Sequence, residues 1–242
     1  MSLDERPRSW AATVGLGGCV GALRESLGAA DRVERPFRHW LLRGLLPWNI
    51  LLALAALPFG APEAASGEGT RESRNESRRY LDADAVAAFA ACRAVARAFQ
   101  APSTVAAVER LAGVALDGAW LRIELAQDRD GFWLKPHTDL GVKRFTLLCY
   151  LDAEGQPEMG TDLYDGSGGW AGRAPFAPGA GLAFTPAGDT WHGFEPRPIA
   201  GVRKSLIVNY VSGAWRAREQ LAFPCAPVHG PAPRRPRPFG GQ

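Results

Sequence analysis

The sequence has few cysteines, no marked excess of charge and no apolar run long enough to span a membrane. Its four cysteines, Cys19, Cys92, Cys149 and Cys225, are scattered and none forms a C-x-x-C pair. This scatter excludes a zinc-binding motif and a disulfide framework, and reduced thiols are typical of a cytoplasmic protein. The 28 basic and 25 acidic residues give a net charge of +3, which argues against nucleic acid as a partner.

The N-terminal third of the sequence predicts neither a targeting signal nor a membrane span. The first ten residues mix acidic and basic side chains without an apolar run directly behind them, so we expect no secretory signal and a cytoplasmic location. The most apolar stretch, residues 45–59, contains Pro47, Asn49 and Pro58 and is shorter than the roughly 20 residues that a span needs. We expect this stretch to be a buried helix that packs on the core or flanks the active site, with no membrane span, and the alternative is a helix that lies at a membrane interface.

Histidine is also scarce, and two of the four histidines stand in a recognisable pattern. His137 and Asp139 are two residues apart, so on a strand both side chains point to one face. His192 lies much further along the chain and must come from another strand. Two imidazoles and one carboxylate are the usual ligands of a non-haem Fe(II) oxygenase. His39 and His229 have no partner pattern, and we interpret them as structural or incidental.

A basic residue and a hydroxyl follow the second histidine of this pattern. Arg203 and Ser205 are again two residues apart, on one face of the next predicted strand. A guanidinium group binds a carboxylate through two parallel hydrogen bonds, so Arg203 is a candidate for holding an acidic co-substrate. Side chains that converge from several strands predict the inside of a barrel or double sheet.

The strands and helices around these residues can be placed from their patterns. Apolar, β-prone runs between glycine and proline turns predict strands at residues 120–125, 145–151, 181–185, 191–195 and 204–211. Several short strands of this kind favour a sandwich or a jelly roll. Before them, Asp82 is expected to cap a helix over residues 83–99, and a second helix from Pro102 to Leu111 is expected to end at Gly113.

With these pieces in order, residues 120–224 resemble the 2-oxoglutarate- and Fe(II)-dependent oxygenases, nearest to the prolyl-hydroxylase-like branch. The matching pieces are residues 137–139, 145–151, 160–163, 181–184, His192 and residues 203–205. The resemblance implies a mainly β fold with flanking helices and a double-stranded β-helix core, which is a jelly roll of the cupin-like kind. It also implies a reaction that couples decarboxylation of 2-oxoglutarate to oxidation of a C–H bond by O2.

The resemblance assigns roles to the residues in the motif. His137, Asp139 and His192 would bind Fe(II). Arg203 would pair with the distal carboxylate of 2-oxoglutarate, and Ser205 would donate its hydroxyl to the same carboxylate.

Four further positions refine this comparison with the family. Tyr150 resembles a tyrosine that reaches the co-substrate carboxylate in relatives, and Gln127 occupies a place where relatives often have a polar co-substrate contact. Asp139 stands where family halogenases have a small residue, so halogenation is disfavoured. Nucleic-acid demethylases of the family carry a second arginine at the position of Asn209, so that subclass is disfavoured as well.

A chain of 242 residues fits one sizeable domain. We expect residues 1–60 to form a helical segment that packs on the core and residues 61–79 to form a linker. Residues 80–224 would form the oxygenase domain, and residues 225–242 would form a disordered tail rich in proline and arginine.

Two other functions fit parts of the pattern. One is a non-enzymatic, cupin-like module that binds a small acid at a degenerate metal site. The other is a metal-dependent enzyme that uses no 2-oxoglutarate, such as a cysteine-type dioxygenase or an isomerase. We expect a small-molecule or peptidyl substrate, whose identity the sequence leaves open together with the oligomeric state.

Overall fold

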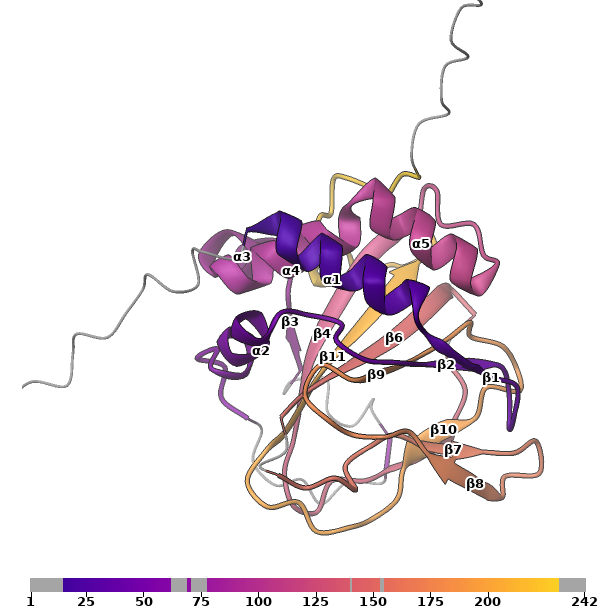
Figure 1. Cartoon of the computed structure of the whole chain (residues 1–242). Coiled ribbons are helices and arrows are strands. Elements are labelled where there is room, and N and C mark those ends of the chain that lie inside the picture. The colour runs from indigo at the N-terminus through magenta and orange to yellow at the C-terminus, as the bar shows by residue number, and fades with distance from the viewer. Residues whose placement is uncertain (1–14, 62–68, 71–77, 140, 153–154, 231–242) are drawn as a thin grey trace, which may run out of the picture.

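The computed structural model describes residues 15–61, 69–70, 78–139, 141–152 and 155–230. Its centre is a sheet of seven antiparallel strands, in the order β1-β2-β9-β6-β11-β4-β3, which faces a smaller sheet with the order β5-β10-β7-β8 (Figure 1). Two antiparallel sheets with flanking helices confirm the predicted jelly-roll class. Most of the predicted linker and residues 231–242 lie outside the described residues.

The large sheet contains the strands that the sequence predicts most clearly, together with three short strands toward its two edges. Its long members are β4 (Trp120–Asp128), β6 (Lys143–Asp152) and β11 (Arg203–Val211), and β9 (Gly181–Phe184) pairs with β6. The short strands are β1 (Asp31–Val33), β2 (His39–Leu42) and β3 (Arg79–Tyr80). The long strands are buried on both faces because helices cover one face and the small sheet covers the other.

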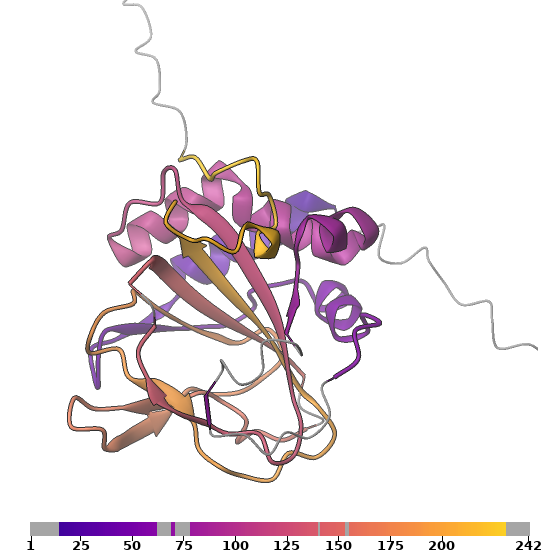
Figure 2. The ribbon, with the colours of Figure 1, turned by 180° about the vertical axis from the view of Figure 1, so that it is seen from behind.

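The small sheet carries two of the three candidate metal ligands. It consists of β5 (Leu134–His137), β10 (His192–Phe194), β7 (Asp162–Tyr164) and β8 (Trp170–Arg173). An apolar cluster that includes Leu148, Leu163 and Ile207 fills the space between the two sheets. The view from behind shows the long strands running between the helices and the small sheet (Figure 2).

Helices form a layer over the outer face of the large sheet. They are α1 (Leu16–Gly28), α2 (Trp48–Ala55), α3 (Ala83–Ala88), α4 (Ala90–Gln100) and α5 (Pro102–Ala112), and a short 3-10 turn, η3 (Arg218–Gln220), follows the last strand. The main apolar core lies between this layer and the sheet, where Phe99, Val105 and Ile123 are fully buried. No helix among the described residues is long and apolar enough to cross a bilayer.

The predicted helix starts and stops hold, except at one internal break. Asp82 accepts a hydrogen bond of 2.8 Å from the backbone N–H of Ala85, and Gly113 ends α5 in the left-handed conformation at φ 70°. The expected helix over residues 83–99 is wrong in one respect, because Phe89 is extended and divides it into α3 and α4. No proline or glycine marks this break, and the Phe89 ring instead packs edge-on against Phe59.

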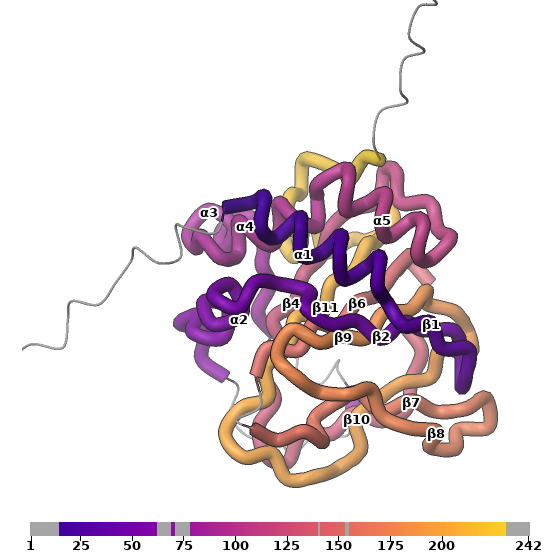
Figure 3. The backbone as a smooth tube through the Cα atoms, in the orientation of Figure 1, coloured from indigo at the N-terminus to yellow at the C-terminus, as the bar shows by residue number. Residues whose placement is uncertain are grey.

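The two ends of the described chain are more integrated than the sequence predicts. Residues 39–42, in the segment expected to be helical, form β2 and pair with β9 (Figure 3). In the predicted tail, Val228 is fully buried, and its N–H donates a hydrogen bond of 2.7 Å to the carbonyl of Ala119. The disorder expected from residue 225 onward is therefore wrong for residues 225–230, because this backbone pairs with the segment that leads into β4.

Candidate metal and co-substrate site

The three predicted metal ligands meet between the small sheet and the end of β6. His137 is the last residue of β5, and His192 is the first residue of β10 and its direct partner across the strand pair. Asp139 follows two residues after His137. One ligand atom from each residue lies within 4.8 Å of the others, and the two imidazole rings are 4.4 Å apart between centroids. This spacing is compact enough for one ion to contact all three side chains.

Backbone carbonyls orient both histidines for metal binding. The Nδ1 atom of His137 lies 3.0 Å from the carbonyl oxygen of Lys135, and Nδ1 of His192 lies 2.9 Å from that of Thr190. A carbonyl can only accept, so each Nδ1 donates its proton, and in the neutral ring Nε2 carries the lone pair that a metal ion binds. A second hydrogen bond of this type is the usual way in which a protein fixes the tautomer of a metal-binding histidine.

Asp139 is held as an anion by two donors on its two oxygens. Lys143 donates to Oδ1, and the hydroxyl of Thr146 donates to Oδ2 over 2.6 Å. Burial favours the neutral acid, but the charges of Lys143 and His192 and the bonds from Lys143 and Thr146 outweigh it. The pKa of Asp139 therefore lies well below its usual range. A carboxylate that stays ionised at neutral pH is the form that binds a metal ion.

A cavity of about 200 Å³ opens beside these ligands and extends along the inner face of the large sheet. Its lining includes all three ligands, Arg203 near one end of β11, and Arg122 on β4. The register places Arg203 opposite Asp128, whereas Arg122 lies six residues earlier on β4, opposite Asn209. At about 3.3 Å per residue the two arginines are anchored roughly 20 Å apart along the strands.

The structure places Arg203 in this cavity with part of its hydrogen-bonding capacity in use. The side chain is 4 % exposed. Its Nε donates to the carbonyl of Met159 over 2.7 Å, and Nη1 donates to the carboxylate of Asp128. Within the described part of the chain, Nη2 has no hydrogen-bond partner. The guanidinium group also stacks over the Phe194 ring at 4.6 Å, so its plane is fixed before any ligand arrives.

Ser205 and Tyr150 lie close to Arg203 but differ in their contacts. The hydroxyl of Ser205 is buried and has no hydrogen-bond partner among the residues that the structure describes. The hydroxyl of Tyr150 instead donates to Thr161 Oγ1 over 3.0 Å and accepts from the Thr161 N–H, and burial raises the pKa of this phenol. The unpartnered hydroxyl of Ser205 fits a missing ligand, whereas the hydroxyl of Tyr150 already has two partners.

Gln127 lies outside the site. Its neighbour Ala126 faces the interior cluster between the sheets, so Gln127 points to the opposite face, where its amide donates to the carbonyl of Gly60 over 3.2 Å. The co-substrate contact suggested for Gln127 is therefore wrong, because alternate residues of a strand lie on opposite faces.

Several residues of the site escaped the sequence analysis. Gly69 and Thr70, in the predicted linker, line the cavity, and the carbonyl of Gly69 accepts a bond of 2.9 Å from the N–H of Lys135. Gly69 has φ 68°, and a Cβ there would lie 2.3 Å from the Trp133 ring, so only glycine fits. The polar row of Thr146, Asn209 and Arg122 was also missed, although the shared face of Arg122 and Glu124 was visible in the alternation of β4.

Comparison of the sequence with family models and with curated proteins finds no match. The fold is similar to solved prolyl hydroxylases. A prolyl-4-hydroxylase from Pseudomonas putida is 17 % identical and aligns over 80 % of this chain and 98 % of its own, with a TM-score of 0.51. A prolyl 4-hydroxylase from Phytophthora capsici is 12 % identical, over 88 % and 68 %, with a TM-score of 0.51.

A viral collagen prolyl hydroxylase from Paramecium Bursaria Chlorella virus-1, solved as a complex with 2OG, also has a similar fold. It is 13 % identical and aligns over 72 % of this chain and 96 % of its own, with a TM-score of 0.51. Sequence identities this low support a shared fold and do not identify the substrate of this chain. The fold expected from the resemblance is confirmed, since the chain has the fold of these prolyl hydroxylases.

Proposed function

We propose that the protein is a 2-oxoglutarate- and O2-dependent Fe(II) dioxygenase that hydroxylates an unactivated C–H bond. One oxygen atom of O2 would enter the substrate as a hydroxyl group, and the other would enter succinate as 2-oxoglutarate loses CO2. The observation that carries this proposal is the convergence of His137, Asp139 and His192 in a cavity that Arg203 also lines. A degenerate metal site would have lost at least one of these side chains.

The residues present fit both groups. The Nε2 atoms of His137 and His192 and the Asp139 carboxylate would hold Fe(II), which when bound would activate O2, the oxidant that breaks the C–H bond. The Nη2 atom of Arg203 and the hydroxyl of Ser205 would hold the distal carboxylate of 2-oxoglutarate. Both have capacity for it, since neither has a hydrogen-bond partner in the described part of the chain.

Tyr150 has a smaller part in this proposal than the sequence suggested. Its hydroxyl would reach the co-substrate only by exchanging its bonds to Thr161. We propose that Tyr150 instead orients Thr161, which itself lines the cavity.

The substrate and the setting are part of the same proposal. A small-molecule or peptidyl substrate would enter from the side of the cavity lined by Gly69 and Thr70, with no nucleic acid involved. The four cysteines are free thiols, and three of them are buried, which supports the predicted cytoplasmic location.

Anaerobic titration with Fe(II), with and without 2-oxoglutarate, tests the first half of this proposal. We expect stoichiometric metal binding and a 2-oxoglutarate affinity that depends on the metal. Turnover with O2 and a panel of metabolites and peptides, followed by measurement of succinate, tests the second half. Binding of the acid without metal, and no succinate from any panel member, would favour the cupin-like binding module. Metal-dependent turnover without succinate would favour an enzyme that uses no 2-oxoglutarate.

A further inference from the structure

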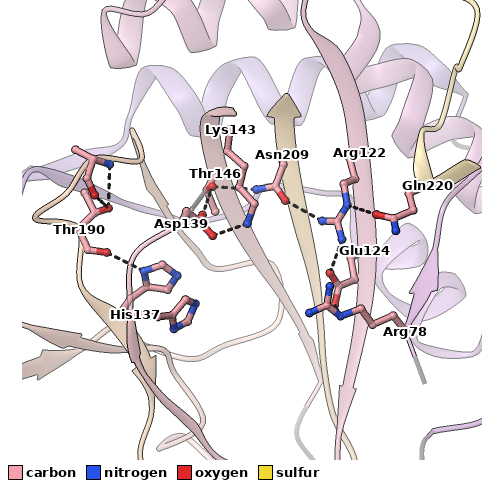
Figure 4. Close-up of polar contacts among 12 residues, drawn as sticks. Arg78, Arg122, Glu124, His137, Asp139, Lys143, Thr146, Thr190, Asn209 and Gln220 are labelled. Atoms are coloured by element: carbon pink, nitrogen blue, oxygen red, sulfur yellow. Dashed lines mark hydrogen bonds and ion pairs between the residues drawn. The ribbon is translucent and has the colours of Figure 1, made fainter. Parts of the chain in front are cut away.

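A row of buried polar side chains crosses three neighbouring strands of the large sheet and ends at Asp139. Asn209 on β11 lies directly opposite Thr146 on β6 and directly opposite Arg122 on β4. The hydrogen bonds follow this row from Arg122 Nη1 to Asn209 Oδ1 over 3.1 Å, from Asn209 Nδ2 to Thr146 Oγ1 over 2.9 Å, and from Thr146 Oγ1 to Asp139 Oδ2 over 2.6 Å. Figure 4 shows the four side chains in sequence.

Arg122 fixes the direction of every bond in this row. A guanidinium group donates and cannot accept, so the Asn209 atom beside it must be the amide oxygen. The NH2 group of Asn209 then faces Thr146 and occupies an acceptor position of its hydroxyl. The single proton of that hydroxyl is left to point at Asp139. A threonine without this neighbour is able to rotate its proton elsewhere.

The head of the row is itself immobilised. Arg122 is 2 % exposed, and its other nitrogens donate to Gln220, Tyr80 and Glu124 over 2.9 to 3.1 Å. Asn209 is fully buried and Thr146 is 2 % exposed. Hydrogen bonds at this depth are stronger than in water, and the members of such a chain polarise one another.

We propose that Arg122 and Asn209 are positioning residues that keep the Thr146 proton on the metal-binding carboxylate. With Lys143 on Oδ1 and Thr146 on Oδ2, the carboxylate of Asp139 has one orientation toward the ion. The inference rests on the proposed function, because it takes Asp139 as a metal ligand. Partners of this kind behind a ligand typically contribute about 10- to 100-fold to metal affinity.

Co(II) is a suitable probe, because its visible absorption reports the coordination geometry and needs no substrate. The central variant is Asn209→Asp in the full chain. The new carboxylate would still accept from Arg122, but it cannot donate to Thr146 and would compete with Asp139 for the Thr146 proton. We expect Co(II) affinity to fall about tenfold, with a changed absorption spectrum and an unchanged stoichiometry. The Thr146→Val variant should show the same loss, and Thr146→Ser should restore wild-type values.

The double variant separates the proton from the added charge. In the Thr146→Val background there is no proton to redirect, so Asn209→Asp should produce no further loss. Gln220→Leu is the matched control, because it removes one bond of 2.9 Å from Arg122 on the side away from Asp139. Its Co(II) affinity should equal that of the wild type. Thermal unfolding of each metal-free variant reports any general loss of stability.

The outcomes distinguish the relay, by which we mean the effect of Arg122 and Asn209 on the Thr146 proton, from the metal site itself. Additive losses in the double variant, an equal loss in Gln220→Leu, or wild-type binding by Thr146→Val would each overturn the relay. If Asn209→Asp does not fold, the comparison of Thr146→Val with Thr146→Ser decides alone. Wild-type Co(II) binding by His192→Ala would instead overturn the proposed function, and the relay with it.

Discussion

Two buried arginines on the inner face of the large sheet are used in different ways. Arg122 is 2 % exposed and Arg203 is 4 % exposed. All three nitrogens of Arg122 have partners, whereas Arg203 has two bonds and, in the described part of the chain, a remaining Nη2. Arg122 also stacks against the Tyr80 and Trp215 rings, at 4.7 and 4.9 Å. Burial alone therefore does not distinguish an arginine that supports the fold from one that can still receive a ligand.

The surroundings of the two arginines show the same contrast. Near Arg122 the side-chain oxygens of Asn209 and Gln220 accept hydrogen bonds from the arginine itself. Near Arg203, on the same face of β11, the hydroxyl of Ser205 is buried without a partner among the described residues. Buried polar groups are nearly always hydrogen-bonded, so an unsatisfied one requires an explanation. An acidic ligand at Arg203 would provide it.

The largest expected effect comes from removing one of the three metal ligands. The row from Arg122 ends at one of these ligands, and Arg203 lines the cavity beside them. His137→Ala and His192→Ala should each abolish Fe(II) binding and turnover, because each removes one of three protein ligands. Asp139→Ala should abolish hydroxylation. Metal content after reconstitution and succinate formation are the measurements. Full activity in His192→Ala would refute the assignment of His192 as a metal ligand. The contrast between Arg122 and Arg203 would then have no functional meaning.

The next effect is on stability and should be confined to Arg122. Arg122→Met removes the donor to Asn209 Oδ1 and one cationic partner of Glu124, which also pairs with Arg78 at 3.9 Å, and breaking a buried charged pair in this way costs about 3–5 kcal/mol. Urea unfolding of the metal-free protein measures the loss. The double variant Arg122→Met/Glu124→Met removes both charges of this pair and should recover part of the loss, because Arg78 then loses its pairing with Glu124. A stable Arg122→Met protein would mean that the network around Arg122 is not a support of the fold.

Arg203 should affect the co-substrate more than the metal. Loss of a charge-assisted contact to a desolvated carboxylate costs about 2–5 kcal/mol, so the 2-oxoglutarate affinity of an Arg203 variant should fall tens- to thousands-fold while Fe(II) still binds. Arg203→Lys should recover only part of the 2-oxoglutarate affinity, because an ammonium group does not reproduce the two parallel hydrogen bonds of a planar guanidinium group.

The structure changes the best variant for this test. Arg203→Ala alone would leave the buried carboxylate of Asp128 without its partner, so a loss of folding would obscure the result. Arg203→Gln combined with Asp128→Asn removes both charges and keeps the shape. Calorimetric titration with 2-oxoglutarate is the measurement, and Asp128→Asn alone is the control. An unchanged affinity in the double variant would show that the acid binds elsewhere.

Much of the fold is predictable because the sequence marks it locally. The runs at residues 145–151 and 204–211 are apolar and bounded by turns. β6 extends the first run by two residues at its start and one at its end, and β11 begins one residue before the second. The spacing of His137 and Asp139 places both on one side of a strand end. Arg203 and Ser205 follow the same rule on β11. Each of these features depends on neighbours within a few residues, which is what a sequence pattern records.

The rest depends on strand order, which local patterns do not contain. Thr146, Asn209 and Arg122 form a row only because β11 lies between β6 and β4. Asn209 was read from the sequence as the absence of a second arginine, and its bonds to both neighbours were not foreseen. The pairing of Asp128 with Arg203 likewise follows from the register of β4 against β11. Long-range partners of this kind become visible only when the sheet is assembled.

The smallest predicted effect is also the sharpest test of the contrast between the two arginines. Ser205→Ala should leave the stability of the metal-free protein unchanged or slightly higher, because the deleted hydroxyl has no partner in the described structure and its burial is a cost. The same change should weaken 2-oxoglutarate binding by about 0.5–1.5 kcal/mol, the usual worth of one hydrogen bond. Urea unfolding and calorimetric titration measure the two quantities on one preparation. Unchanged or higher stability together with weaker 2-oxoglutarate binding is expected only if the partner of this hydroxyl is a ligand. Lower stability with unchanged co-substrate affinity would assign Ser205 to the fold, and Arg203 would then lose its main support as the acid-binding end.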